Sequence, residues 1–228
     1  MGRGRHPARI HVKPPDEATA QKYLLNWNRR ELYFNPQHFP KISSQTLFGN
    51  NRKLQMDIGS ATGEFVCSLA KKHPDVNFLG VEVATKPVYK SIKHAVAFGL
   101  DNIKFILTDF RLLYPLLLPE SLQKVYFHFP VPILKKVDSK YRVYSPEFLD
   151  AIYSALCPGG ILSVMSDMPE YYQIMYEEAC KDARYELIAG DETIEAIDPE
   201  DRSHYHKIWD SQGRETYRFL MKKAKLIL

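Results

Sequence analysis

Three acidic residues in the first half of the chain each follow a short run of apolar residues. Asp57 lies in MDIGSATGEF, Glu82 closes NFLGVEV, and Asp109 closes NIKFILTD. A carboxylate in such a position can accept hydrogen bonds from two ribose hydroxyls, and an acid one strand further on can face an exocyclic amine of adenine. The three acids together therefore predict a site for a nucleoside.

Two glycines follow the first acid. Gly59 and Gly63 permit a sharp turn and a close approach of the backbone to a ligand, although such glycines alone are a weak signal. Their spacing is GxxxG and not GxGxxG, which disfavours a pyrophosphate at the helix N-terminus. A glycine loop followed by acids at the next two strand ends is typical of methyltransferases that bind S-adenosyl-L-methionine.

The same acids have structural roles as an alternative. Glu82 could cap the turn into Thr85, and Asp109 could cap a helix that begins at Phe110. We favour ligand binding because both acids occur together, behind one glycine loop.

A basic loop follows the strand-like segment KVYFHF in KVYFHFPVPILKK (124–136). The loop has a single acid, Asp138, and four basic residues, which are Lys135, Lys136, Lys140 and Arg142. Such a charge run is usually a solvated surface. Next to a nucleoside site, however, contacts with the phosphates of a nucleic acid are the better interpretation. Tyr141 and Tyr144 lie among these residues and could stack on a base or pack the loop.

Elements that would position these residues alternate regularly along the chain. We predict strands at 53–58, 77–83, 102–109, 123–129 and 159–167, and helices at 17–30, 64–73, 85–98, 146–156 and 169–183. This alternation predicts an α/β protein with a doubly wound, mostly parallel sheet. Ligands of such sheets bind beyond the carboxyl ends of the strands, which is where the three acids lie.

Length and composition indicate one main domain. With 228 residues, of which 45% are hydrophobic, we expect a basic flexible arm (1–16), an N-terminal helix and linker (17–52) and a catalytic domain (53–228). The net charge of +4 is too small to identify a nucleic-acid binder, so the arm could touch a polyanion or be a solvated tail.

Three widely spaced cysteines and the lack of a membrane span or signal peptide predict a cytoplasmic protein. Both a monomer and a homodimer are compatible with the sequence.

Four segments in the same order resemble the bacterial tRNA (guanine-N7)-methyltransferase family. They are the stretch from Met56 to Ala95, the loop YFHFPVPILKK, the segment SPEFLDAIYSALCPGGILSVMSD and the tail SHYHKIWDSQGRETYRF, and the resemblance covers roughly residues 45–222. It implies a Rossmann-like class I fold with a seven-stranded sheet and an antiparallel last strand. It further implies S-adenosyl-L-methionine as cofactor, tRNA as substrate and partner, and transfer to N7 of a guanine. In this resemblance Asp57, Glu82 and Asp109 match acids that surround the cofactor.

Two positions depart from the family pattern. The family has Phe-Pro-Asp-Pro-Trp with a catalytic aspartate in the basic loop, whereas this chain has Val131 there. The family's Thr-x-x-Glu in the tail becomes Ser203 to His206. Asp167 matches a substrate acid, and we expect it to position guanine as the catalytic carboxylate, with an N-cap of the following helix as the alternative. Ser203 would add a polar contact, and His206 could be a neutral acceptor or a surface residue.

Methyl transfer to guanine N7 does not require a general base, because N7 carries an exposed lone pair. Loss of the loop carboxylate should therefore slow the reaction by roughly 100- to 1000-fold without removing it. Two alternatives remain open: an inactive member that only binds cofactor or RNA, and a methyltransferase with another substrate.

Overall fold

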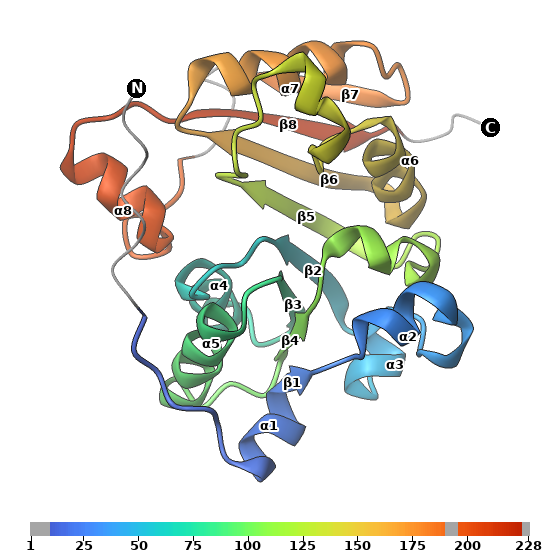
Figure 1. Ribbon diagram of the computed structural model, residues 1–228, viewed down its shortest axis with the longest axis vertical. Helices are drawn as coiled ribbons and strands as arrows, with labels where there is room; N and C mark the ends of the chain where they lie inside the picture. The colour runs from blue at the N-terminus through green and yellow to red at the C-terminus, as the bar shows by residue number, and fades with distance from the viewer. Residues whose placement is uncertain (1–9, 190–195, 225–228) are drawn as a thin grey trace.

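The computed structural model describes residues 10–189 and 196–224, in which the strands form a single sheet (Figure 1). The strand order is β1-β4-β3-β2-β5-β6-β8-β7, and only the pairs that include β8 are antiparallel. The strands are β1 (Leu24–Leu25), β2 (Lys53–Ile58), β3 (Val76–Glu82), β4 (Ile103–Leu107), β5 (Leu122–His128), β6 (Leu156–Ser166), β7 (Tyr185–Ala189) and β8 (Tyr217–Lys223). The mostly parallel sheet and the antiparallel last strand are confirmed, with one strand more than expected.

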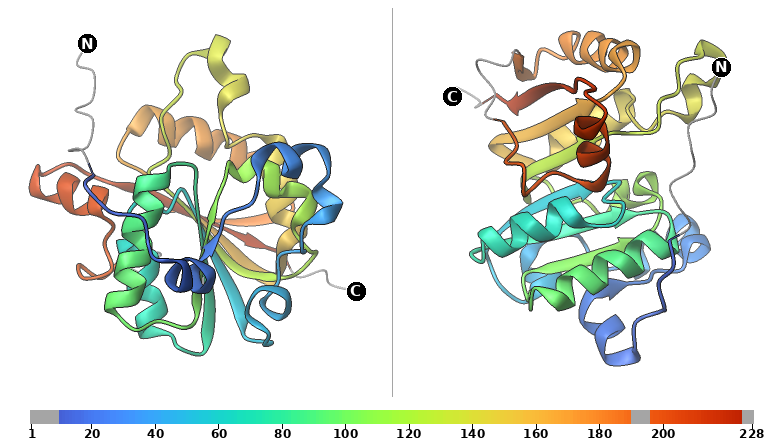
Figure 2. Two further views of the ribbon diagram at one scale, coloured as in Figure 1. Left: turned by 60° about the horizontal axis from the view of Figure 1, so that its bottom comes forward. Right: turned by 90° about the vertical axis from the view of Figure 1, so that its left-hand side faces the viewer.

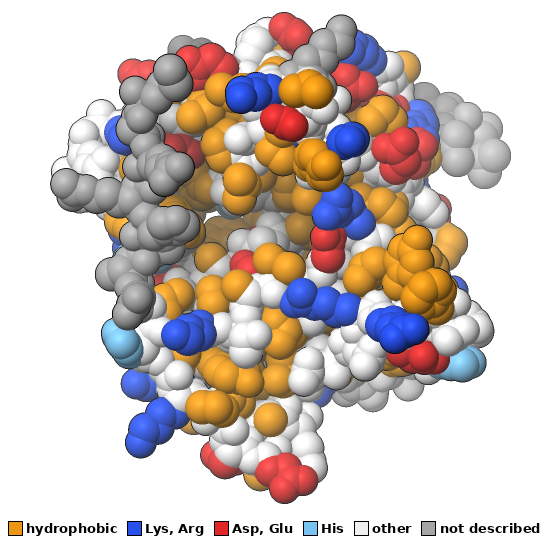
Figure 3. All heavy atoms as spheres, in the orientation of Figure 1, with side chains coloured by type: hydrophobic (Ala, Val, Ile, Leu, Met, Phe, Trp, Pro, Cys, Tyr) orange, Lys and Arg blue, Asp and Glu red, His pale blue; other side chains and the backbone are white. Residues whose placement is uncertain are grey.

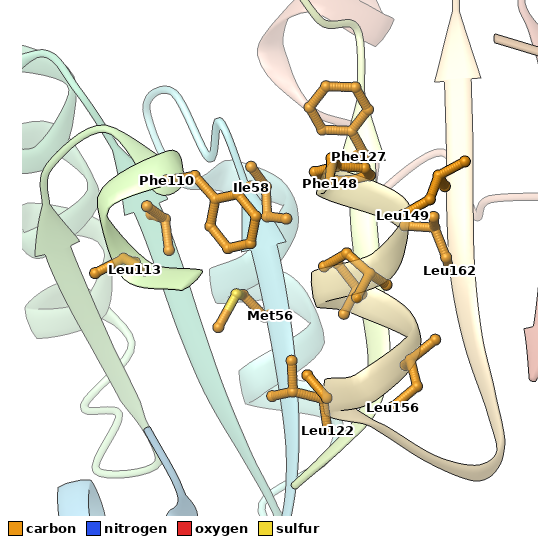
Figure 4. Packing of buried hydrophobic residues seen from close by; sticks show 14 of the residues in the cluster. Met56, Ile58, Phe110, Leu113, Leu122, Phe127, Phe148, Leu149, Leu156 and Leu162 are labelled. Atoms are coloured by element: carbon orange, nitrogen blue, oxygen red, sulfur yellow. The ribbon is translucent and has the colours of Figure 1, made fainter. Parts of the chain in front are cut away.

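Helices cover both faces of the sheet, as a doubly wound fold requires (Figures 1 and 2). One face carries α1 (Glu17–Tyr23), α4 (Glu64–Lys72) and α5 (Thr85–Ala97), and the other carries α2 (Arg29–Phe34), α3 (Ser44–Phe48), η2 (Phe110–Leu116), α6 (Pro146–Ala155) and α7 (Pro169–Cys180). On the second face Met56 and Ile58 of β2 pack with Phe110 and Phe148 (Figure 4). The elements η1 (Pro36–His38), η3 (Lys136–Tyr141) and α8 (His204–Ser211) complete the described fold.

The helix predicted over residues 17–30 is wrong in its middle. Leu24 and Leu25 form the edge strand β1, which pairs in parallel with Phe105 and Ile106 of β4. Pairing with the sheet edge overrides the local helical propensity. A new helix then begins behind the N-cap Asn28, whose side chain accepts from the N–H of Glu31.

Most other predicted elements agree with the structure to within a few residues. Strand β2 has the predicted bounds, and Ser145 caps α6 by accepting from the N–H of Phe148. Strand β6 begins earlier, at Leu156, and the predicted linker contains α3. Part of the predicted basic arm, residues 1–9, lies outside the described residues. Among the described helices, none is both long and apolar enough to cross a bilayer.

Candidate active site

The glycine loop between β2 and α4 exposes its backbone at Gly59. Gly59 and Gly63 both have left-handed backbones, with φ of 79° and 78°. A Cβ on Gly59 would meet no atom within 4 Å, whereas a Cβ on Gly63 would lie 2.6 Å from Cβ of Ser91 on α5. Gly63 therefore lets the helices pack closely, and only Gly59 borders open space in which a ligand could lie.

Glu82 at the end of β3 ties this loop to the next strand. Its Oε2 accepts from the N–H of Ala61 at 3.1 Å, and its Oε1 accepts from the N–H groups of Val83 and Ala84 at 2.8 and 2.9 Å. Ala61 has φ of 46°, a strained conformation for a residue with a side chain. The expected turn cap is therefore present, and it fixes the carboxylate at the rim of the site.

Asp57 lies one strand away and is 4% exposed. Burial, with a smaller contribution from the negative charge of Glu82, raises its pKa to about 7. The two acids are therefore electrostatically coupled. A cationic group in the site would relieve their repulsion and favour the ionised form of Asp57.

Asp109 follows β4, and its carboxylate is bound by Arg111. Arg111 Nη2 lies 2.6 Å from Oδ2 and Arg111 Nε 3.0 Å from Oδ1, while Oδ1 also accepts from the N–H of Arg111 at 3.0 Å. These contacts with Arg111, aided by the charge of Arg29, outweigh the effect of burial and lower the pKa of Asp109. The predicted cap of the helix at Phe110 is thus also present.

The three acids lie at the carboxyl ends of three neighbouring strands of the sheet. Strands β2, β3 and β4 are neighbours, with Asp57 opposite Gly80 and Glu82 opposite Leu107. Adjacent strands lie about 4.8 Å apart, so the acids span roughly two strand spacings. The structure therefore places Asp57, Glu82 and Asp109 around the mouth of the glycine loop.

Asp167 lies directly after β6, with its side chain 22% exposed and Oδ2 3.9 Å from Nη1 of Arg214. Arg214 in turn stacks over the ring of Trp209 at 4.2 Å. The N-cap of α7 is Met168, and that position makes no side-chain capping bond. The alternative role of Asp167 as an N-cap is therefore wrong, and its carboxylate remains partly accessible.

The tail residues lie on and before α8. Ser203 caps this helix by accepting from the N–H of His206. The alternative of a surface histidine is wrong, because His206 is 6% exposed and its ring centroid lies 5.5 Å from that of Phe129. Burial, opposed only partly by Asp210, lowers the pKa of His206, which favours a neutral imidazole.

A cluster of charges anchors the segment that leads into α8. Lys72 of α4 contacts three acids, at 3.0 Å from Asp198, 2.6 Å from Glu200 and 2.8 Å from Asp201. Ser68, also on α4, donates to Asp201 at 2.6 Å. The hydrogen bonds to these carboxylates raise the pKa of Lys72. This anchor holds α8 beside the loop that follows β5.

The loop after β5 is largely exposed. It starts at Phe129, which has a left-handed backbone with φ of 52°, and Val131 is 80% exposed. Lys135 and Lys140 are also exposed. Arg142, in contrast, donates to the carbonyls of Ile133 and Leu134, so it shapes the loop from within.

The two tyrosines of the loop separate in the structure. Tyr141 is 57% exposed with Lys140 over its ring at 5.1 Å, while Tyr144 is buried against Phe148. Lys136 belongs to η3, and its side chain lies outside the described residues. Tyr141 and the exposed lysines are thus the groups that can meet a large substrate here.

Four residues near the site were not expected from the sequence. Arg29 donates to the carbonyl of Val83, Arg111 holds Asp109, and Arg214 lies by Asp167. The pKa of Tyr205 on α8 is raised by burial and by the charge of Glu82, so α8 lies close enough to Glu82 for that charge to act on its phenol. Only Arg111 had a sequence signal, since it lies two residues from a predicted capping acid.

Comparisons with known proteins identify a methyltransferase family. A family model described as a putative methyltransferase matches residues 51–219. A protein of Chloroherpeton thalassium named tRNA (guanine-N(7)-)-methyltransferase is 52% identical over 222 residues, covering 97% of this chain and 98% of the relative. A protein of Rubrobacter xylanophilus with the same name is 40% identical and covers 94% of this chain and 96% of its own.

Solved structures support the fold alone. The 16S rRNA methyltransferase KamB superposes with a TM-score of 0.54 at 16% identity, covering 77% of this chain and 89% of that one. The aminoglycoside resistance methyltransferase NpmB1 gives 0.53 at 22% identity, with coverage of 76% and 88%.

Proposed function

The chain belongs to the tRNA (guanine-N(7)-)-methyltransferase family, and we propose that it transfers a methyl group from S-adenosyl-L-methionine to N7 of a guanine in tRNA. The observation that carries this proposal is the 52% identity to a relative of that name across 97% of the chain. Three free cysteines fit a reducing compartment, so we place the reaction in the cytoplasm.

The acids at the strand ends would hold the nucleoside half of the cofactor. Glu82 would accept from a ribose hydroxyl with the lone pair of Oε2 that its bond to Ala61 leaves free, and Asp109 would face the adenine amine beside Arg111. The exposed backbone of Gly59 would lie against the cofactor, and the carboxylate of Asp57 would favour a positive charge on the cofactor. S-adenosyl-L-methionine supplies an electrophilic methyl group on a sulfonium centre.

Asp167 would hold the guanine. Its carboxylate can accept from N1 and N2 of the base and stabilise the positive charge that develops when N7 is methylated. Ser203 and the neutral His206 would add polar contacts from α8, with Phe129 packed against the imidazole. Since N7 already has a lone pair, these groups position the base and do not remove a proton from it.

The exposed lysines of the loop after β5 would bind the tRNA backbone. We propose Lys135, Lys136 and Lys140 as phosphate contacts, which would make affinity fall with salt. Arg142 would contribute by holding the loop conformation through the carbonyls of Ile133 and Leu134.

Val131 favours a second candidate, a member that binds the cofactor and RNA but turns over slowly or not at all. Asp138, the acid of this loop, lines a pocket of about 450 Å³ with Pro132, Lys135 and Tyr141. Asp138 is therefore the acid of this loop that could take over the role of the family's aspartate, whose position is Val131 in this chain.

Incubation of an unmodified tRNA transcript with labelled S-adenosyl-L-methionine tests the proposal. Nucleoside analysis should find 7-methylguanosine, and a Glu82→Ala variant should give much less at limiting cofactor. Bound cofactor without any transfer would instead support the second candidate. Label in another nucleoside would assign a different substrate atom.

A further inference from the structure

A second pocket lies on α2, outside the residues that hold the cofactor or the guanine. It has a volume of about 570 Å³ and is lined by Asn28, Arg30, Glu31, Phe34 and Asn35. This volume is within the usual range of ligand sites, roughly 300 to 1,000 Å³.

One wall of this pocket is aromatic and exposed. Phe34 is 65% exposed and the neighbouring Tyr33 is 67% exposed, with their ring centroids 5.0 Å apart at 88°. Large aromatic side chains are usually buried, so an adjacent pair of them in solvent is a candidate contact surface. A flat base stacking on such a ring is a common mode of binding single-stranded nucleic acid.

The rest of the pocket is polar. Oδ1 of Asn28 accepts from the N–H of Glu31, and Nδ2 of Asn35 donates to the Glu31 carboxylate, which also pairs with His38. The carboxamide nitrogen of Asn28 and oxygen of Asn35 therefore remain for the edge of a base. Arg30 is exposed and makes no hydrogen bond or ion pair with the described part of the chain, so its charge is available to a phosphate.

The position of α2 relates this pocket to the reaction site. Arg29 donates to the carbonyl of Val83, next to Glu82, and its charge lowers the pKa of Asp109. Both views of Figure 2 show α2 and the loop after β5 on the same side of the molecule. Figure 3 shows Lys and Arg side chains spread over this face with hydrophobic side chains between them.

We propose that this pocket binds an unstacked nucleotide of the tRNA substrate, with the base against Phe34 and Tyr33 and a phosphate at Arg30. The inference rests on the proposed function, because the same face would carry the tRNA. A nucleic acid fits better than a second copy of the chain, because the aromatic pair is small and its rim carries Arg30 and carboxamides, while the Glu31 carboxylate is bound by Asn35 and His38. A stable protein interface typically buries about 1,200 to 2,000 Å² of mostly contiguous surface.

A Tyr33→Ala/Phe34→Ala double variant tests the stacking. We expect its affinity for a tRNA transcript to fall about 5- to 150-fold, with the same dependence on salt and unchanged affinity for S-adenosyl-L-methionine. Phe98→Ala is the matched control, since Phe98 is 43% exposed at the end of α5, and it should leave tRNA affinity unchanged. An unchanged tRNA affinity in the double variant would overturn the proposal.

Arg30→Gln tests the phosphate contact separately. It should weaken tRNA binding and reduce the slope of log affinity against log salt by about 1. Sedimentation of the wild type and the double variant identifies a competing occupant: a dimer lost in the variant would contradict the proposal. If the wild type makes no 7-methylguanosine but the double variant still loses tRNA affinity, the proposed reaction fails and the pocket stands.

Discussion

The cofactor side and the substrate side of the site are built in different ways. On the cofactor side, Glu82 accepts from three backbone N–H groups and Asp109 is held by Arg111, so the acids are fixed by the ends of three adjacent strands. On the substrate side, the groups come from a loop, a strand end and α8, and Val131 in the loop is 80% exposed. The comparison teaches that the substrate side has Val131 on an exposed loop in place of an acid, whereas Glu82 and Asp109 on the cofactor side are held by hydrogen bonds at their strand ends.

The largest effect is expected on the substrate side at Asp167. Asp167→Ala should abolish transfer, or reduce kcat by about 1000-fold, because it removes the acid that we propose holds guanine and stabilises its developing charge. Cofactor affinity should stay the same by isothermal titration calorimetry. Asp75→Ala, an exposed acid just before β3 at the end of the sheet away from the site, is the matched control, and an equal loss in that variant would contradict the role of Asp167.

On the cofactor side, Glu82→Ala should remove a charged hydrogen bond to the ribose, because Oε2 keeps one lone pair beyond its bond to the N–H of Ala61. At about 1.5 to 3 kcal/mol, its loss weakens S-adenosyl-L-methionine binding roughly 10- to 150-fold. Titration calorimetry measures the cofactor affinity. Circular dichroism checks that the variant stays folded although Ala61 loses its hydrogen bond to Glu82. Glu186→Ala, at an exposed position of β7, is the control. Unchanged cofactor affinity in Glu82→Ala would mean that the ribose lies elsewhere.

Asp57 gives the cofactor side a pH dependence. Its pKa is about 7 in the folded protein against 3.8 for an ordinary carboxyl, so the unfolded chain loses this proton first as pH rises. The buried acid therefore lowers the free energy of unfolding. This loss is absent below about pH 4, grows between about pH 4 and 7, and reaches at most about 4 kcal/mol. Asp57→Asn should therefore gain stability over the wild type across that window in cofactor-free denaturant titrations. An equal difference at pH 4 and pH 8 would contradict the assignment.

The smallest effects are expected at the exposed lysines of the substrate side. Lys135→Ala and Lys140→Ala should each weaken tRNA binding several-fold and lower the salt slope by about 1. Filter binding at several salt concentrations measures both quantities. Lys53→Ala, at the opposite end of β2 from the site, should leave the slope unchanged. A salt slope that does not change in the loop variants would remove these lysines from the interface.

Much of the cofactor side could be predicted from the sequence because its residues follow strands. The apolar runs before Asp57, Glu82 and Asp109 fix where each acid lies, and parallel pairing then brings them to one edge. Residues 24–25 were predicted as helix because their place at the sheet edge depends on β4, which lies far along the chain.

The substrate side was less accessible to sequence reasoning because its contacts join distant segments. The burial of His206 depends on Phe129, and the partner of Asp167 is Arg214, neither of which has a local signal. Arg142 was predicted as a phosphate contact, but its bonds to Ile133 and Leu134 arise from the path of the loop. Residues at strand ends can therefore be placed from the sequence, whereas contacts between distant loops cannot.

The single-turnover rate of 7-methylguanosine formation, compared between the natural chain and a Val131→Asp variant, tests most directly whether the substrate side works without its loop carboxylate. The natural chain should methylate tRNA, and the variant should be faster by roughly 100- to 1000-fold, because a charge-stabilising contact is regained. If the natural chain forms no product with bound cofactor and tRNA while Val131→Asp does, the remaining groups are insufficient for catalysis, and the account is contradicted.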